Sequence, residues 1–494
     1  MTTENSQLKD KLAAYFDEHF DEILADLSEI MSIDSSFGTP SEGKPFGDGS
    51  AAALAWGAKK GSELGLNVRN FDNYAVSMTC GEGDPALAIL SHLDVVPATP
   101  EGWQHPPFAC TVDDGYIYGR GAIDDKGPSV AVLWAVKALK ELNVPLTKAF
   151  RVIFGGNEER GCKDIAYYQT KEPFPPMVFT PDGSFPVLNC EKGMIHLTFS
   201  APFNDFTDAN YILTENNVKQ WEYTIPSVKS ISAGSVINAI PDKCVVTYKS
   251  IDERDEETKA TVLDDSFMAY LFGDDRMRKI IQEQWDKCAY HEVETYTGKP
   301  SHGSRPENGD NAITKFLAAY KGGSELLKAL ARLFPHGEYD GKSCGLGFSD
   351  EISGQMTCAL TLLNTDGGRL CGGIDIRFPI DRTVSEISGI ITKALENAGF
   401  TVDEIESMEP HYVPAESEFV QTLLQVYEDV KGERGEPVAE GGITYVHNTP
   451  GAVAFGAEFP WEDNRMHGID ERVSVETFKL NLNMYANAIA RLCR

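Results

Sequence analysis

Short apolar runs alternate with helical segments between residues 50 and 180, and this alternation leaves few folds open to the chain. The runs at 86–91, 150–154 and 177–180 have the length and composition of buried strands, and 130–142 has those of a buried helix. Strands that alternate with helices are typical of βαβ units. The sequence therefore predicts an α/β fold with a mostly parallel central sheet flanked by helices.

The pattern changes in the middle of the chain, where residues 193–413 are more polar and richer in predicted strands. Helices within this stretch are expected at 256–290, 310–333 and 383–398. After it, an amphipathic helix at 419–430 and a buried strand at 452–455 resume the first pattern. The simplest interpretation is an α/β domain, residues 1–192 and 414–494, interrupted by an inserted α+β domain at 193–413.

The charge balance and the cysteines restrict the partners and the compartment. The chain carries 44 Lys and Arg against 75 Asp and Glu, a net charge of −31, which disfavours nucleic acid and anionic membranes as partners. The longest apolar run, 130–136, is far shorter than the ~20 residues of a membrane span. No secretory signal is expected at the polar N-terminus, and the ten cysteines include no Cys-x-x-Cys pair. We therefore expect a cytoplasmic protein with reduced thiols.

Five short segments place a histidine or carboxylates in a loop, and four of them lie at or beyond the carboxyl end of a predicted strand. The segments are 91–94, 119–128, 157–161, 180–183 and 466–471. Residues two apart on an extended chain point the same way, so Asp94 can reach the imidazole of His92 and fix its tautomer. Sites in open α/β sheets form at the carboxyl ends of strands. Together these segments predict a functional site, although each alone would be typical of a helix cap or a structural pair.

Three segments, 92–97, 119–127 and 157–159, together form a pattern that is highly specific for one family of enzymes. With them, nearly the whole chain resembles the zinc-dependent exopeptidases that include aminoacylase, glutamate carboxypeptidase, carnosinase and acetylornithine deacetylase. Within that family it is most similar to PepV-like dipeptidases. The resemblance implies that 193–413 is a lid of two ferredoxin-like halves that closes over a small peptide substrate. It also implies a monomer, because lids of this doubled kind do not need a partner.

The resemblance implies a site for two zinc ions, and mixed His and carboxylate ligands would also accept Mn²⁺ or Co²⁺. His92 and Asp182 would bind one ion, and Glu159 and His467 would bind the other. Asp124 would bridge both, with a water or hydroxide as the second bridge.

Further carboxylates would serve the reaction without binding metal. Glu158 would be the general base, which takes a proton from the water and passes it to the leaving amine. Asp94 would support His92. Asp125 follows the bridging Asp124, and in relatives the peptide bond between them is cis.

Substrate contacts are implied at five more positions. His302 would stabilise the oxyanion, and Asn238 would support the same oxygen. Arg377 would pair with the substrate carboxylate, unless it forms a salt bridge on a strand face. Gly442 and Thr444 belong to a glycine turn that would line the substrate pocket.

The resemblance favours a metal-dependent dipeptidase whose substrates have free amino and carboxyl termini. An amidohydrolase that removes acyl groups from amino acids would use the same residues and is the main alternative. Two departures bear on substrate choice, because His447 stands where relatives often carry Arg or Lys, and Gly183-Ser184 where PepV-like proteins carry an acidic pair. A non-enzymatic binder is disfavoured by the intact ligand and base positions, and an oxidoreductase by the missing phosphate loop.

Overall fold

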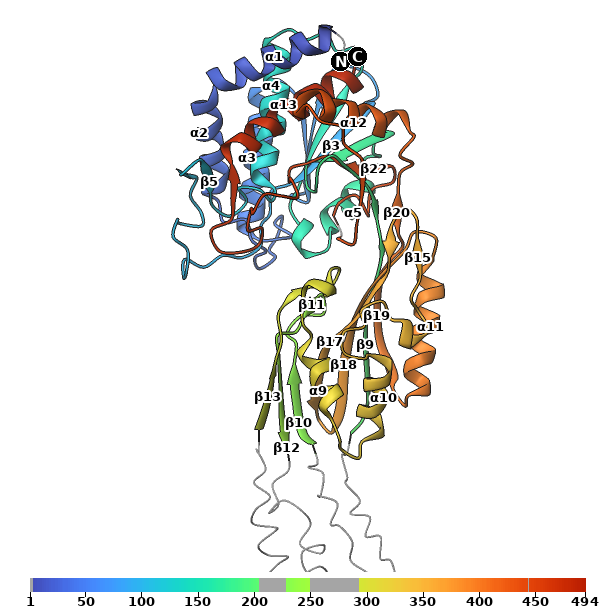
Figure 1. Ribbon diagram of the computed structural model, residues 1–494. Coiled ribbons are helices and arrows are strands. Elements are labelled where there is room, and N and C mark those ends of the chain that lie inside the picture. Colours follow the sequence, from blue (N-terminus) through green and yellow to red (C-terminus); the bar gives the residue numbers. More distant parts are fainter. Residues whose placement is uncertain (1–2, 204–227, 249–292, 443) are drawn as a thin grey trace, which may run out of the picture. The chain divides into compact units, whose positions relative to one another are not determined.

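The chain folds into two compact units, which are shown in Figure 1. The computed structural model describes residues 3–203, 228–248, 293–442 and 444–494. One unit comprises Met1–Lys192 and Pro410–Arg494, and the other comprises Gly193–Glu409. Each unit has a hydrophobic core of its own. The helix expected at 256–290 lies outside the described residues.

The first unit is built on a nine-stranded sheet with a parallel centre. In spatial order, the central strands are β6 (Phe150–Gly155), β3 (Leu87–His92), β7 (Met177–Thr180) and β22 (Ala452–Ala454). Neighbours among these four pair in parallel. Each strand lies where a short apolar run predicted one, and the predicted α/β class with its parallel central sheet is confirmed.

Further strands complete this sheet and form a smaller one. The large sheet continues with β1 (Asn67–Phe71) and β2 (Ala75–Cys80) beyond β6, and with β8 (Val187–Glu191), β20 (His411–Tyr412) and β21 (Pro437–Glu440) beyond β22. The small antiparallel sheet consists of β4 (Thr111–Asp113), β5 (Tyr116–Tyr118) and β23 (Arg472–Ser474). Its pairing of Tyr118 with Arg472 joins the loop that follows β5 to the loop that precedes β23.

Helices surround the large sheet and bury its apolar faces. They are α1 (Thr3–Glu18), α2 (Phe20–Met31), α3 (Asp48–Glu63), α4 (Lys126–Glu141), α5 (Lys163–Gln169), α12 (Glu418–Lys431) and α13 (Val475–Leu492). Helix α4 is buried along most of its length because it contacts β3 on one side and helices α2 and α13 on others (Figure 1). This position explains why residues 130–136 are apolar without interruption.

The second unit contains a seven-stranded antiparallel sheet covered by helices. Its strand order is β13 (Val293–Thr297), β12 (Lys243–Tyr248), β10 (Val228–Ala233), β17 (Thr357–Asp366), β18 (Arg369–Phe378), β9 (Gly193–Pro202) and β19 (Thr401–Met408). The helices are α9 (Ala312–Ala319), α10 (Glu325–Leu333) and α11 (Val384–Asn397). Ile195, Leu197 and Phe199 alternate with other residues along β9 and share one core with α11. The predicted α+β insert is therefore confirmed.

Short strand pairs in the second unit connect its loops. They are β11 (Ala239–Ile240) with β14 (Ser301–His302), and β15 (Ser349–Asp350) with β16 (Gly354–Gln355). Throughout the described parts of both units, the cysteines are free thiols. None of the helices found there combines the length and the apolar character needed to cross a bilayer.

Candidate metal centre

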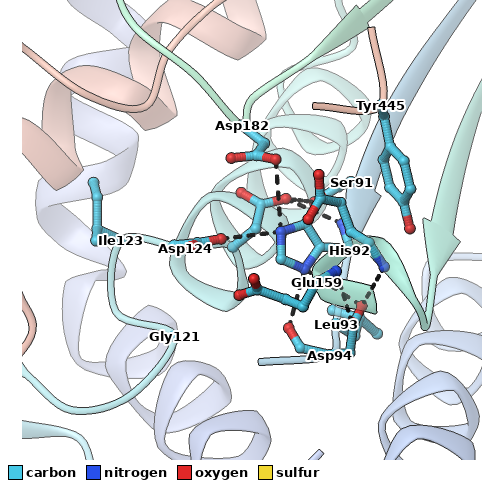
Figure 2. Close-up of polar contacts among 12 residues, drawn as sticks. Ser91, His92, Leu93, Asp94, Gly121, Ile123, Asp124, Glu159, Asp182 and Tyr445 are labelled. Carbon is cyan, nitrogen blue, oxygen red and sulfur yellow. Dashed lines mark hydrogen bonds and ion pairs between the residues drawn. The ribbon is translucent and has the colours of Figure 1, made fainter. Parts of the chain in front are cut away.

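The parallel centre of the first sheet brings several polar loops to one edge. β3 ends at His92, β6 leads to the short helix η1 (Glu158–Arg160), and β7 leads to Asp182. These three strands are neighbours and run in the same direction, so their carboxyl ends lie together. Figure 2 shows the His92 ring among the carboxylates of Asp182, Asp124 and Asp94.

Two groups of ligand atoms meet at this edge, and the atoms of each group lie within 4.8 Å of one another. The groups are His92, Glu158 and Asp182, and Asp124, Glu159 and His467. Asp124 joins the two, because its Oδ1 is 3.0 Å from His92 Nε2 and its Oδ2 is 2.7 Å from His467 Nε2. His92 Nε2 also lies 3.6 Å from Asp182 Oδ2, and His467 Nε2 lies 3.4 Å from Glu159 Oε1. The structure thus brings together every metal ligand that the resemblance implies.

Two of these ligand atoms are buried without a hydrogen-bond partner, namely His92 Nε2 and Glu159 Oε1. Although Asp124 lies close to His92 Nε2, their approach does not have hydrogen-bond geometry. Buried polar atoms in proteins nearly always have a partner. Imidazole nitrogens and carboxylate oxygens are ligands that Zn²⁺, Mn²⁺ and Co²⁺ accept. The residues therefore fit a metal site.

Several ionisable groups of the site have shifted pKa values. Burial raises the pKa of Glu158 well above its usual range, and the charge of Asp182 raises it further. Burial also raises the pKa of Glu159, and the negative charge of Asp124 raises it further. Burial alone would lower the pKa of His467, but contacts with Asp124 and Glu159 raise it to about 11. Without metal, protons therefore compensate the negative charge of the carboxylates. In the protein with bound metal, the ions would compensate this charge.

Metal binding is expected to strengthen as the pH rises. His467, with its pKa of about 11, is protonated at neutral pH, and the contacts of His92 with Asp124 and Asp182 outweigh burial and raise its pKa as well. Ligation requires neutral imidazoles, so affinity should rise up to about tenfold per pH unit for each proton released. Calorimetric Zn²⁺ titrations between about pH 6 and pH 8, in buffers of different ionisation enthalpy, measure the change of affinity with pH and the number of protons released. Affinity that does not change with pH, without proton release, would contradict the expectation.

Asp94 connects His92 to the loop that carries Glu158 and Glu159. Its backbone carbonyl lies 3.0 Å from His92 Nδ1, whereas its carboxylate Oδ1 is 3.5 Å from that nitrogen. The carboxylate accepts hydrogen bonds from the backbone N–H groups of Glu158 at 3.1 Å and Glu159 at 3.2 Å. Asp94 thus contacts the His92 ring chiefly through its main chain and holds the neighbouring loop with its side chain.

Asp125 is buried and connects the end of β3 to the start of α4. The peptide bond between Asp124 and Asp125 is cis, as the resemblance implies. The Asp125 carboxylate accepts hydrogen bonds from the Ser91 hydroxyl and, at 3.1 Å, from the backbone N–H of His92. Asp125 therefore fixes the backbone of the proposed ligand His92, and it directly follows the proposed ligand Asp124 in the sequence.

One buried pair beside the ligands was not expected from the sequence. Asp164 accepts hydrogen bonds from the Tyr445 hydroxyl and, at 2.8 Å, from the backbone N–H of Asn157. The Tyr445 ring meets the His92 ring edge to face (Figure 2). Burial raises the pKa of Asp164 to about 6. Asp164 and Tyr445 are 281 residues apart, so no local motif indicates that they meet.

The glycine turn predicted to line the substrate pocket is anchored by a buried carboxylate. Thr444 Oγ1 donates a hydrogen bond to Glu191 Oε1 at 2.9 Å, and His447 Nδ1 lies 2.8 Å from Glu191 Oε2. Burial raises the pKa of Glu191. Gly442 lies in the same turn, two residues before Thr444. His447, which departs from the family pattern, thus has a buried acidic partner.

His302, Asn238 and Arg377 lie in the second unit. The pairing of β11 with β14 brings Asn238 and His302 into one small structure, in which the N–H of Gly303 donates to the Asn238 carbonyl at 2.7 Å. Arg377 is buried and makes two hydrogen bonds of 2.8 Å to Asp375. These bonds form the strand-face salt bridge that the sequence leaves open for Arg377.

Sequence comparisons place the chain among known peptidases. A family model described as Peptidase family M20/M25/M40 matches residues 88–491. YtjP of Bacillus subtilis is 32% identical over 486 residues, which cover 96% of this chain and 98% of that protein. A Beta-Ala-Xaa dipeptidase of Lactobacillus delbrueckii subsp. lactis is 32% identical over 492 residues, covering 96% of both chains.

Solved structures show the same fold. The crystal structure of human carnosine dipeptidase 1 is similar with a TM-score of 0.57 and 16% identity, covering 98% of this chain and 99% of that one. An aminoacylhistidine dipeptidase from Vibrio alginolyticus gives a TM-score of 0.58 with 15% identity, covering 95% and 96%. At these identities the likeness concerns the fold alone. The family match extends over most of the sequence, and this chain therefore belongs to peptidase family M20/M25/M40 and is a metallopeptidase.

Proposed function

We propose that this metallopeptidase is a two-metal dipeptidase that hydrolyses the peptide bond of dipeptides with free amino and carboxyl termini. The observation that carries the proposal is the placement of Asp124, whose two carboxylate oxygens reach the imidazoles of both ligand groups. A relative that matches 96% of the chain and bears the name Beta-Ala-Xaa dipeptidase supports the substrate class. Zinc is the proposed metal, with Mn²⁺ and Co²⁺ as alternatives. A cytoplasmic monomer is the proposed form.

Hydrolysis requires a water molecule as nucleophile and a group that moves its proton. Two divalent ions, when bound, supply charge that lowers the pKa of a water molecule and polarises a carbonyl group. Glu158 is the proposed base, because its carboxylate lies beside His92 and Asp182 while Asp94 holds its backbone. A raised pKa suits a group that must hold a proton between the attacking water and the leaving amine.

His302 is the proposed donor to the oxyanion that forms when water attacks the peptide carbon. Its Nδ1 accepts a hydrogen bond from the backbone N–H of Ser304 at 3.2 Å and lies 2.7 Å from the Ser304 hydroxyl. A neutral ring that accepts at Nδ1 carries its proton at Nε2, which can then donate to developing negative charge. In this proposal the second unit closes as a lid. Asn238 then acts with His302 on the oxyanion, and Arg377 stays paired with Asp375.

Replacing His302 with alanine is expected to lower kcat by roughly 10²–10³, because a donor to the oxyanion is lost. Metal content should not change, since the proposed ligands belong to the other unit. His336→Ala is a matched control, because His336 lies in the same unit but contacts Thr314 at 2.9 Å. Steady-state kinetics and metal analysis of both variants check the expectation. An unchanged kcat in His302→Ala would remove His302 from the mechanism.

Amine release from a panel of substrates tests the function as a whole. The panel holds free dipeptides, tripeptides and N-acyl amino acids, and the protein is stripped of metal before Zn²⁺, Mn²⁺ or Co²⁺ is restored. Metal-dependent cleavage confined to free dipeptides is expected, and the rates rank the metals. Cleavage of the N-acyl amino acids alone would identify an amidohydrolase that uses the same site. No cleavage with two metals bound would contradict an enzymatic role.

A further inference from the structure

A buried ion pair lies next to the metal ligands without being one of them. Glu471 is fully buried, and its Oε2 pairs with the guanidinium of Arg120. Its other oxygen, Oε1, accepts hydrogen bonds from the backbone N–H groups of Gly121 at 2.9 Å and Ile123 at 3.2 Å, and a longer one from Asp124 at 3.4 Å. Glu471 therefore holds the loop that presents Asp124.

Arg120 extends the same contact to the loop of His467. Its Nη2 donates to the backbone carbonyls of His467 at 3.2 Å and Gly468 at 3.3 Å. The backbone N–H of Gly119 also donates to the backbone carbonyl of Glu471 at 2.9 Å. One ion pair thus holds the main chain at two ligands that stand 343 residues apart in the sequence.

The His467 loop has a backbone that needs such support. Arg465, His467 and Asp470 have φ angles of 53°, 61° and 54°, in the left-handed region that side-chain-bearing residues rarely adopt. Residues remain in such conformations only where surrounding contacts determine them. The carbonyls of His467 and Gly468 find these contacts in the buried guanidinium of Arg120.

We propose that Arg120 and Glu471 are positioning residues that set the metal affinity of the group formed by Asp124, Glu159 and His467. The inference rests on the proposed two-metal function. Neither side chain contributes an atom to the ligand groups, yet together they fix the distance between the Asp124 and His467 loops. Partners of metal ligands typically change metal affinity by about 10–100-fold when they are replaced. We expect a loss of this size at the position of Glu159 and His467 and a smaller loss at the other position, to which Asp124 also contributes.

Equilibrium dialysis of the full-length protein against buffered Zn²⁺, with the bound metal counted by mass spectrometry, measures both affinities. Glu471→Gln keeps the size of the side chain but removes the charge and one acceptor, and Arg120→Lys keeps the charge but loses the guanidinium fork. Glu172→Gln is the matched control, because Glu172 pairs with Arg151 in the same unit and contacts no proposed ligand. Thermal unfolding of the metal-free proteins shows whether each variant folds.

Comparison with His467→Ala identifies the position that is affected. In the wild-type protein two Zn²⁺ ions are expected, in His467→Ala one, and in both Glu471→Gln and Arg120→Lys one tight and one weak ion. Adding Glu471→Gln to His467→Ala should then change the remaining affinity little, because both act on the same position. Wild-type affinities for both metals in folded Glu471→Gln and Arg120→Lys would overturn the inference while leaving the proposed function intact. Fewer than two metals in the wild-type protein would overturn both.

Discussion

Replacing Glu158 with alanine is expected to lower kcat by about 10²–10⁴ while both metals stay bound. A carboxylate oxygen of Glu158 lies within 4.8 Å of the ligand atoms of His92 and Asp182, so its position alone is compatible with a metal ligand or with a base. The proposed mechanism assigns His92 and Asp182 to the metal and leaves Glu158 to move the proton. A base contributes to the rate and not to metal affinity, which separates the two roles.

Kinetics combined with metal analysis distinguishes these roles. Glu158→Gln retains the side-chain volume and the backbone bond to Asp94, and should behave like Glu158→Ala. Glu159→Ala is the matched comparison, because the adjacent carboxylate is a proposed ligand and its loss should release a metal ion. Residual activity above about one per cent in Glu158→Ala would contradict the assignment as base. A lost metal ion in that variant would reassign Glu158 as a ligand.

The sheet and the position of the loops follow from features that the sequence shows directly. The apolar runs at 86–91, 150–154 and 177–180 correspond to β3, β6 and β7, because a strand buried on both faces is apolar at most of its positions. Parallel strands that share an edge bring their following loops together, which is why segments far apart in the sequence meet at one site.

Such patterns do not predict contacts between segments that lie far apart in the sequence. The His92-x-Asp94 spacing indicates that Asp94 lies near the imidazole, but the Asp94 carboxylate bonds to backbone groups at Glu158 and Glu159, more than 60 residues away. A side chain that bonds to a backbone N–H requires no particular residue type in its partner. The sequence therefore carries no trace of the bond, and only the fold reveals it.

The contact between Arg120 and Glu471 is another that sequence patterns do not indicate. Both lie in segments that the sequence singles out, and a charged residue in such a segment is as compatible with a ligand as with a support. The fold distinguishes the two, because the guanidinium of Arg120 and the carboxylate of Glu471 turn toward each other and toward backbone groups. Local spacing indicates which side chains lie close together, whereas long-range packing determines which groups each side chain contacts.

Replacing Asp124 with alanine is expected to abolish measurable activity and to release both metals. Its two carboxylate oxygens lie 3.0 Å and 2.7 Å from the imidazole nitrogens of His92 and His467, so this carboxylate reaches a histidine ligand in each group. Removing a ligand such as His467 should empty one position, whereas removing the shared carboxylate weakens both. The two positions also lose the negative charge that lets two cations lie close together.

Metal analysis of Asp124→Ala and Asp124→Asn, beside His467→Ala, tests this difference. The pKa of His467 gives an independent readout in the metal-free protein, because Asp124 is the strongest partner that raises it to about 11. In Asp124→Asn that pKa should fall, since the imidazolium loses its counter-charge while its burial remains. A nuclear magnetic resonance titration of the His467 ring measures the shift. If Asp124→Asn still bound two Zn²⁺ ions with wild-type affinity, Asp124 would not bridge the metals, and its role in the proposed mechanism would be wrong.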